Sequence, residues 1–145
     1  MALRDVVNPH ILDLRPYAPG KPIEELEREL GISGSIKLAS NESPLGPSPR
    51  AQAAVRAAVA GLHRYPDGAS FELRRALAAR LEVETDQLVF GAGADEILEL
   101  LAKTFLGPGS EAVFAWPSFA MYPIVVTGMG ATPVPVPLSD ELVHD

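Results

Sequence analysis

A glycine-rich turn followed by two carboxylates is the part of this sequence best suited to bind a ligand. The apolar run 88–90 leads into Gly91 and Gly93, and Asp95 and Glu96 open the amphipathic pattern that follows. A helix that begins at such a turn exposes free N–H groups and the positive end of its dipole, which together bind anions. The alternative is that Asp95 and Glu96 satisfy the helix start themselves. The stretch by itself leaves both interpretations open.

Two common nucleotide sites do not fit this turn. A dinucleotide-binding fingerprint requires G-x-G-x-x-G and an acidic residue at the end of the second strand. Here Glu96 stands at the third glycine position, and Glu111 begins the predicted second strand instead of ending it. A P-loop requires a lysine directly after its last glycine, whereas Lys103 lies well inside the predicted helix. The remaining candidate is a small phosphate monoester held by backbone amides.

The predicted elements around this turn indicate an α/β fold that begins a parallel sheet. Apolar periodicity and terminating residues predict four helices, over residues 49–60, 71–81, 95–106 and 118–127. Ser48 and Ser70 are the expected N-caps of the first two. Short apolar runs predict strands at 88–90 and 112–116. Residues 131–138 carry prolines at alternate positions, which predicts an edge strand that pairs on one side only.

The first fifty residues are rich in proline and glycine. Proline and glycine recur there every few positions, which interrupts helices and continuous strands, so we expect an extended arm. Within it, a short helix is predicted at 22–30 and a short strand at 35–40.

Composition excludes several classes of protein. The 145 residues are 47% hydrophobic, which is enough to bury a core. A formal charge of −7 without a cluster of basic residues argues against nucleic-acid binding. Cysteine is absent, which excludes disulfides and thiolate metal sites, and the three histidines stand apart from one another. No apolar run is long enough to span a membrane. We therefore expect a cytoplasmic protein without metal, membrane or nucleic-acid partners.

Several motifs in a fixed order carry a family resemblance. They are "LRPY" (14–17), "LASNESPLGPSP" (38–49), "RYPDG" (64–68), "GAGADEILELL" (91–101) and "WPSFAMY" (116–122). In this order they resemble the N-terminal part of pyridoxal-phosphate-dependent aminotransferases of fold type I, and most closely the histidinol-phosphate aminotransferase family. The resemblance covers essentially the whole chain. It implies an arm over residues 1–47 and, over 48–145, the incomplete first part of a large cofactor-binding domain with a three-layer αβα architecture.

The resemblance also assigns roles in binding the cofactor, pyridoxal 5'-phosphate. The backbone amides of Ala94 and Asp95 would hold its phosphate. Phe119 would stack on its ring, where an aromatic face serves whether the residue is Phe or Tyr. Tyr65 would reach the phosphate of the partner's cofactor across a homodimer interface. Taken singly, Phe119 is more often a core residue than a cofactor contact, and Tyr65 could be an ordinary turn residue.

The same resemblance implies an activity and a place for its substrates. Tyr17 and Asn41 would lie beside the substrate, although Asn41 alone is also a common turn residue. The implied reaction is the exchange of an amino group between L-glutamate and imidazole-acetol phosphate in histidine biosynthesis. It would yield 2-oxoglutarate and L-histidinol phosphate.

The residues that perform transamination are not found in this sequence. The reaction needs a lysine that carries the cofactor as a Schiff base, a carboxylate for the pyridinium nitrogen, and arginines for the substrate. The lysines present are Lys21, Lys37 and Lys103, and none matches the family's lysine motif. We expect the Schiff-base lysine beyond residue 145. We also expect the 145-residue piece alone to be inactive and poorly soluble or molten.

Other functions remain open at this point. Related aminotransferases for aromatic amino acids, and a related phosphothreonine decarboxylase, share the N-terminal motifs. A non-catalytic paralogue or dimerisation module could keep the phosphate site. An unrelated α/β domain could bind a sugar phosphate at the same turn, but it would leave "NESPLGPSP" and "RYPDG" without a role.

Overall fold

The computed structural model describes residues 2–38 and 40–144. Contacts within the chain divide it into two units, one formed by residues 1–18 and 86–145 and the other by residues 19–85. The predicted boundary between residues 47 and 48 stays a prediction. The helices are α1 Pro9–Leu12, α2 Ile23–Leu30, α3 Pro49–Ala58, α4 Phe71–Leu81, α5 Gly93–Phe105 and α6 Met121–Gly128. The strands are β1 Glu111–Trp116 and β2 Thr132–Pro137, and short 3-10 turns lie at Leu3–Asp5, Val59–Gly61 and Thr85–Gln87.

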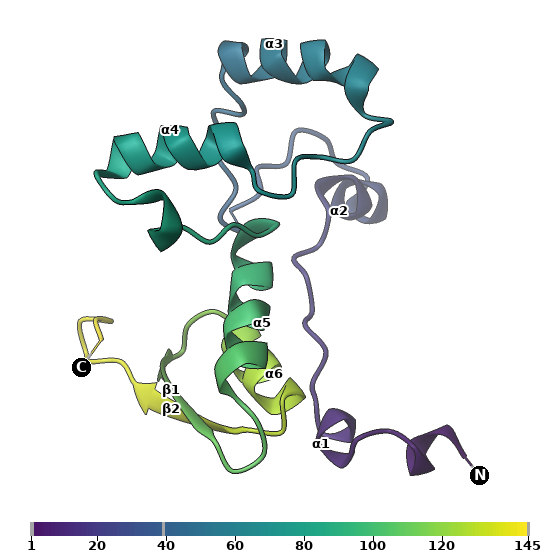
Figure 1. Cartoon of the computed structure of the whole chain (residues 1–145). Helices are drawn as coiled ribbons and strands as arrows, with labels where there is room; N and C mark the ends of the chain where they lie inside the picture. The colour runs from purple at the N-terminus through teal and green to yellow at the C-terminus, as the bar shows by residue number, and fades with distance from the viewer. Residues whose placement is uncertain (1, 39, 145) are drawn as a thin grey trace. The chain divides into compact units, whose positions relative to one another are not determined.

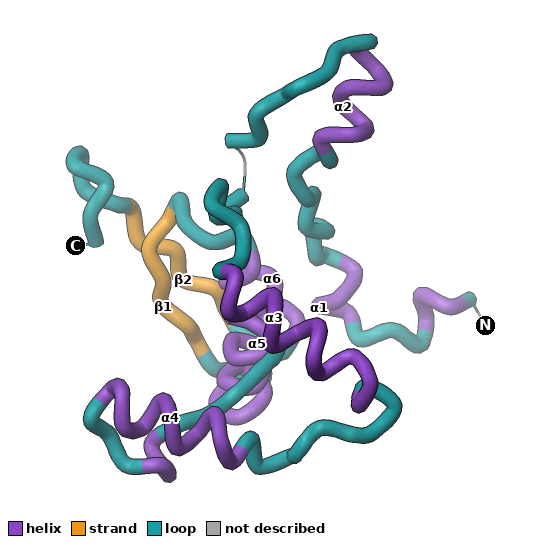
Figure 2. The backbone as a smooth tube through the Cα atoms, turned by 90° about the horizontal axis from the view of Figure 1, so that it is seen from above, coloured by secondary structure: helices purple, strands orange, loops and turns teal. Residues whose placement is uncertain are grey.

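The first unit is built around a parallel strand–helix–strand motif. Strands β1 and β2 pair in parallel, with Glu111 opposite Thr132 and Trp116 opposite Pro137. Helix α6 connects them and packs on both strands, while α5 and the short α1 pack on α6 (Figures 1 and 2). The buried residues of this unit are Ala102 on α5, Val126 on α6 and Ala131 just before β2, each less than 7% exposed. The predicted parallel α/β arrangement is confirmed.

The alternate prolines of β2 explain which edge of that strand is paired. The amide of Thr132 donates to the carbonyl of Ser110 at 2.9 Å, and the amide of Leu138 donates to that of Trp116 at 3.2 Å. The even-numbered residues therefore direct their N–H groups towards β1. Prolines 133, 135 and 137 have the opposite parity, so the N–H groups that they lack would have pointed away from β1. The prediction of an edge strand paired on one side is confirmed.

The strand predicted at 88–90 is absent. Residues 88–90 have no regular secondary structure, and the sheet formed by the described residues has only the strands β1 and β2. A short apolar run indicates a segment that can be buried, but it does not by itself distinguish a strand from other buried backbone. The prediction of the 112–116 strand is confirmed, and β1 extends it by one residue to Glu111.

Two helices of this unit start at positions other than those predicted. Helix α5 begins at Gly93 instead of residue 95, because the second glycine of the turn already lies in the first helical turn. Helix α6 begins at Met121 instead of residue 118. The residues before it form a turn that follows a cis peptide bond between Trp116 and Pro117, and the Ser118 hydroxyl donates to the carbonyl of Ala115 in that turn.

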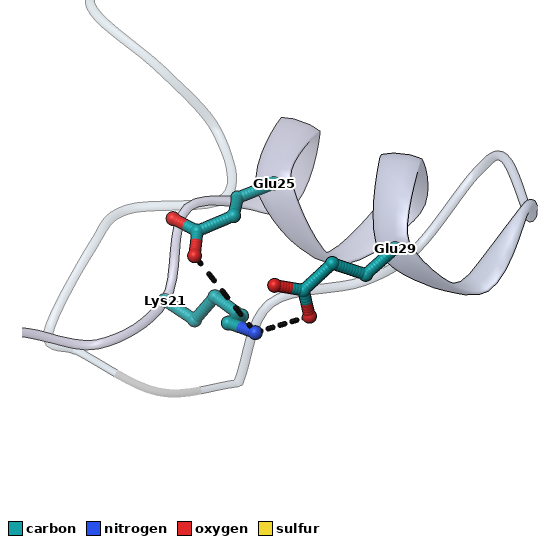
Figure 3. A network of polar contacts seen from close by, with 3 residues as sticks. All are labelled: Lys21, Glu25 and Glu29. Atoms are coloured by element: carbon teal, nitrogen blue, oxygen red, sulfur yellow. Dashed lines mark hydrogen bonds and ion pairs between the residues drawn. The ribbon is translucent and has the colours of Figure 1, made fainter.

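The second unit carries three helices, α2, α3 and α4. Helix α2 starts after Pro22 and ends at Leu30, followed by Gly31, which adopts φ +65 as the C-cap. Its predicted limits therefore hold to within one residue. Lys21 forms an ion pair with Glu25 at 3.9 Å and a second one with Glu29 beyond it (Figure 3). These side chains are about half exposed, so the pairs contribute little to stability.

The predicted N-cap of α3 is confirmed, and that of α4 is wrong. The Ser48 hydroxyl accepts a hydrogen bond from the amide of Ala51, and α3 runs on into a 3-10 turn after Ala58. Ser70 makes no side-chain cap and adopts φ +48. Asp67 caps α4 instead, since its carboxylate accepts from the amides of Ala69 and Phe71. The Asp67 carboxylate has two oxygens and binds two amides, so it takes the capping role expected of the Ser70 hydroxyl.

The short strand predicted at 35–40 is also wrong. Residues 35–38 and 40 have no regular structure, and residue 39 lies outside the described residues. The amide of Ser35 donates to the carboxylate of Glu27 on α2 at 2.8 Å, so a side chain takes the place of a neighbouring strand. Among the described residues, no helix has the length and apolar character needed to cross a bilayer.

Candidate functional site

The glycine turn before α5 is a tight backbone turn that only glycine fits well. Gly93 adopts φ +82, a conformation that strains other residues, and its amide donates to the carbonyl of Gly91 at 2.9 Å. A Cβ placed on Gly91 would lie 2.9 Å from Cδ1 of Ile97 and 3.2 Å from Oε2 of Glu96. Gly91 therefore lets the backbone pass close to Glu96 and Ile97 of α5, and Gly93 allows the positive φ at which α5 starts.

The backbone N–H groups at this turn differ in whether the protein supplies an acceptor for them. The amide of Ala92 donates to the carboxylate of Glu96, which therefore folds back over the turn. The amides of Ala94 and Asp95 have no backbone acceptor outside the helix among the described residues. They belong to the first turn of α5, where a helix provides no acceptor of its own. Glu96 thus satisfies part of the helix start, and two adjacent donors remain for an anion.

A groove of about 590 Å³ adjoins this turn. Asp95, Glu96 and Glu99 line it from α5, together with Met121 and Ile124 from α6 and Leu14 from the N-terminal segment. Its charged side chains are all carboxylates, which repel an anion. An anion at this end of α5 would therefore have to bind through the backbone amides of Ala94 and Asp95 and not through side chains.

Phe119 lies at a second, larger groove of about 730 Å³. Its ring is 40% exposed and meets that of Tyr122 edge-on at 5.8 Å between centroids. Tyr122 in turn lies 5.7 Å from Phe114 of β1. The rest of the groove is largely apolar, with lining residues that include Leu98, Leu101, Phe105 and Val113. Phe119 is therefore a partly exposed aromatic side chain at an apolar surface, and its ring contacts the ring of Tyr122 edge-on.

Tyr17 lies at a third groove, of about 470 Å³. The N-terminal segment lines this groove from Asp13 to Ala18, opposite Trp116 and the α6 residues Pro123, Ile124 and Thr127. Ile124 also lines the groove beside Asp95. The structure thus brings Ala94, Asp95, Phe119 and Tyr17 into one unit, with α6 between the positions of Asp95 and Tyr17.

The remaining two predicted site residues belong to the unit formed by residues 19–85. Tyr65 is fully exposed, at 101%, and Asn41 is also exposed. Tyr65 lies two residues before Asp67, whose carboxylate caps α4 and closes the turn that follows the tyrosine.

Each of the three lysines has a carboxylate partner near the surface. Lys21 pairs with Glu25 and Glu29, Lys37 with Glu42 at 2.8 Å and Lys103 with Glu99 at 2.7 Å. These contacts are surface ion pairs, which contribute little to stability. Within the part of the chain that the structure describes, no group of three or more His, Asp or Glu residues could hold a metal ion.

Two functional contacts escaped the sequence interpretation. Asp67 in "RYPDG" caps α4, and the two amide hydrogen bonds from Phe71 and Ala69 lower the pKa of its carboxyl below the ordinary 3.8. An aspartate shortly before a predicted helix is a usable signal for such a cap. His10 binds the carbonyl of Gly128 on α6, a contact between distant parts of the chain that no local pattern indicates.

Comparison with known proteins decides the family. Residues 33–144 match the family described as aminotransferase class I and II. The chain belongs to this family. It is 48% identical to the histidinol-phosphate aminotransferase of Akkermansia muciniphila over its full length, and 51% identical to histidinol-phosphate aminotransferase 2 of Pseudomonas aeruginosa over 87% of its length.

This aminotransferase chain matches only part of its relatives. It spans 40% of the Akkermansia protein and 35% of the Pseudomonas protein, in each case the N-terminal part. Among solved structures, it resembles the histidinol-phosphate aminotransferase of Sinorhizobium meliloti in complex with pyridoxal-5'-phosphate. The TM-score is 0.80 at 28% identity, and the match covers 94% of this chain and 36% of that one. The chain therefore has the α/β fold of the N-terminal part of these aminotransferases.

Proposed function

We propose that this chain forms part of a pyridoxal-phosphate-dependent aminotransferase of histidine biosynthesis. The enzyme transfers the amino group of L-glutamate to imidazole-acetol phosphate, which yields 2-oxoglutarate and L-histidinol phosphate. The observation that carries the proposal is the pair of open amides at Ala94 and Asp95, in a chain 48% identical to a histidinol-phosphate aminotransferase along its whole length.

The residues at the α5 turn fit the phosphate of the cofactor. Two adjacent N–H groups at a helix N-terminus match the oxygens of a phosphate monoester, and the helix dipole favours its charge. Phe119 is 40% exposed, with Tyr122 edge-on to its ring, so an aromatic side chain is accessible to the cofactor ring. When bound, pyridoxal phosphate carries the amino group between substrates and acts as a sink for the charge that develops at the substrate α-carbon.

The other predicted site residues support the proposal by their exposure. We assign Tyr17 and Asn41 to the substrate side of the site and Tyr65 to the cofactor phosphate of the partner subunit in a homodimer. A tyrosine that stands fully in solvent in a single chain is available for such an interface. We place the enzyme in the cytoplasm, with small-molecule substrates as its ligands. The Schiff-base lysine belongs to the rest of the enzyme, since Lys21, Lys37 and Lys103 are all paired with carboxylates.

Two substitutions of Asp95 in the full-length protein test the phosphate site. Asp95→Asn keeps the backbone amide, whereas Asp95→Pro removes it at a first-turn position where a helix tolerates proline. We expect the asparagine variant to bind pyridoxal phosphate as the natural protein does, and the proline variant to bind it at least tenfold more weakly, about the effect of losing one charge-assisted hydrogen bond. Cofactor absorption during titration measures both affinities.

A matched control separates the lost amide from the effects of proline itself. Glu25 is an acidic residue at the same position of α2 that Asp95 occupies in α5, so Glu25→Pro introduces the same change away from the site. We expect this variant to keep its cofactor. Equal losses of cofactor in Asp95→Asn and Asp95→Pro would contradict the amide role.

Substrate assays test the reaction. Purified full-length protein should transfer the amino group of L-histidinol phosphate to 2-oxoglutarate faster than that of aromatic amino acids. Preference for an aromatic amino acid would assign the protein to a sister enzyme, and decarboxylation of phosphothreonine would exclude transamination as its function.

A further inference from the structure

His10 caps the C-terminal end of α6 from the N-terminal segment. Its Nε2 lies 3.1 Å from the carbonyl oxygen of Gly128, the last residue of α6, and the contact is partly buried. A carbonyl oxygen only accepts hydrogen bonds, so Nε2 carries the proton and donates. The last carbonyls of a helix have no partner within it, so the imidazole satisfies a group that would otherwise need water.

Gly130 leaves space for the same ring. A Cβ on Gly130 would lie 3.2 Å from Nδ1 and 3.3 Å from Cε1 of His10, closer than such contacts normally are. Gly130 also adopts φ +72, which strains other residues. The end of α6 and the turn after it therefore accommodate His10 in two ways. Gly128 supplies a hydrogen-bond acceptor, and Gly130 has no side chain to collide with the ring.

The segment that follows His10 passes along two of the three grooves. Leu14 lines the groove beside Asp95, and Tyr17 lines the groove beside Trp116, with Ile124 of α6 shared between them. Residues 14–18 have no regular secondary structure, and the amide of Leu14 donates to the carbonyl of Ile11 at 3.3 Å. Helix α1, which carries His10, packs on α6 (Figures 1 and 2).

We propose that His10 is a positioning residue. It anchors the N-terminal segment to the end of α6 and thereby places Tyr17 at its groove. The inference rests on the proposed function, because Tyr17 is assigned there to the substrate side of the site. His10 itself contacts neither substrate nor cofactor. Loss of the anchor therefore weakens substrate binding through Tyr17 and leaves the Ala94–Asp95 phosphate site intact.

The test uses the full-length protein with His10→Ala and His10→Gln. Alanine removes the donor, whereas the glutamine amide can still donate to the carbonyl of Gly128. We expect His10→Ala to raise the Michaelis constant for L-histidinol phosphate and the hydrogen-exchange rate of the peptide covering residues 8–17, each about fivefold, the usual effect of one hydrogen bond. The affinity for pyridoxal phosphate should not change. His10→Gln should restore most of both losses.

Two glycine variants test the space for the ring. Gly130→Ala crowds His10 and strains the backbone, whereas Gly109→Ala introduces the same kind of strain at φ +89 with nothing within 4 Å of the new Cβ. We expect Gly130→Ala to reproduce the faster exchange of His10→Ala, and Gly109→Ala to leave exchange in residues 8–17 unchanged. Equal exchange in both glycine variants would overturn the role of Gly130.

Hydrogen exchange keeps this test separate from that of the proposed function. If the protein bound pyridoxal phosphate but had no aminotransferase activity, the reaction would be wrong, and exchange in residues 8–17 would still report on the anchor. Unchanged exchange in His10→Ala would overturn the anchor. Faster exchange with an unchanged Michaelis constant would overturn the positioning of Tyr17, and a failure of His10→Gln to restore either quantity would show that the hydrogen bond is not the cause.

Discussion

The backbone amide of Phe71 donates a hydrogen bond of 2.8 Å to Oδ2 of Asp67, and the amide of Ala69 donates one of 3.0 Å to Oδ1. One carboxylate thus binds the start of α4 and closes the turn that follows Tyr65. The aspartate of "RYPDG" therefore has a structural role at the start of α4, separate from the role proposed for its tyrosine.

The Asp67 cap predicts a dependence on pH. Hydrogen bonds from Phe71 and Ala69 lower the pKa of the carboxyl below 3.8 in the folded protein. The folded pKa is the lower one, so the stabilisation is present above about pH 4, the unfolded value, and is lost as the pH falls through the folded pKa. The chemical shift of the Phe71 amide, followed by NMR during an acid titration, should change with a midpoint below 3.8.

Asp67→Asn supplies the control for this titration. The variant keeps an acceptor oxygen but has no charge, so the Phe71 amide should no longer respond in that pH range. A midpoint at or above 3.8 in the natural protein would contradict the cap.

The close approach at Gly91 predicts a steric effect at the phosphate turn. Gly91→Ala places a Cβ 2.9 Å from Cδ1 of Ile97 and 3.2 Å from the Glu96 carboxylate, so both side chains must shift. We expect the free energy of unfolding to fall by about 1 kcal/mol, the low end for overpacking, because Cδ1 ends a flexible side chain. The affinity for pyridoxal phosphate should fall as well. Thermal denaturation and cofactor titration measure the two effects.

Gly107 at the other end of α5 is the matched control. A Cβ there would meet nothing within 4 Å. Gly107→Ala should therefore leave cofactor affinity unchanged, and a loss as large as that of Gly91→Ala would refute the steric explanation.

The alternation of N–H directions along β2 predicts unequal losses of stability for substitutions at two neighbouring residues. Val134 has the parity whose N–H groups point towards β1, so Val134→Pro should remove a hydrogen bond from the ladder and leave an acceptor unpaired, at a cost of about 1–3 kcal/mol. Pro135 is exposed and has no N–H to lose, so Pro135→Ala should cost at most about 1 kcal/mol, through the entropy of the unfolded chain. Denaturant unfolding compares the two. If Pro135→Ala proved the more damaging variant, the assigned pairing would be wrong.

Phe119 should affect cofactor binding through its aromatic face. Phe119→Tyr keeps that face, and we expect it to bind pyridoxal phosphate as the natural protein does. Phe119→Leu keeps an apolar side chain without the ring, and its affinity should fall by about two- to tenfold, the usual value of one aromatic contact. Phe105→Leu is the control, because Phe105 lines the same groove and is 71% exposed. Equal losses in Phe119→Leu and Phe105→Leu would exclude stacking.

The regular elements could be predicted wherever the signal was local. Proline and glycine at the helix ends placed α2 to within a residue, the apolar periodicity gave the limits of α4, and Ser48 placed the start of α3. The three prolines of β2 even indicated which edge of the strand is paired. The same reasoning failed for residues 88–90 and for the described part of 35–40, because a short apolar run does not by itself distinguish a strand from other buried backbone.

The sequence by itself determined the family, through the order of its motifs, and indicated an anion site at the turn before α5, because a tight glycine turn and a helix start are local features. The structure was needed to choose between the two local interpretations of that turn: Glu96 binds the amide of Ala92, and no backbone acceptor outside the helix is found for Ala94 and Asp95 among the described residues. It alone joined His10 to Gly128. Backbone conformation follows from neighbours along the chain, whereas a side chain's hydrogen-bond partner depends on which segments packing brings within about 3 Å of it.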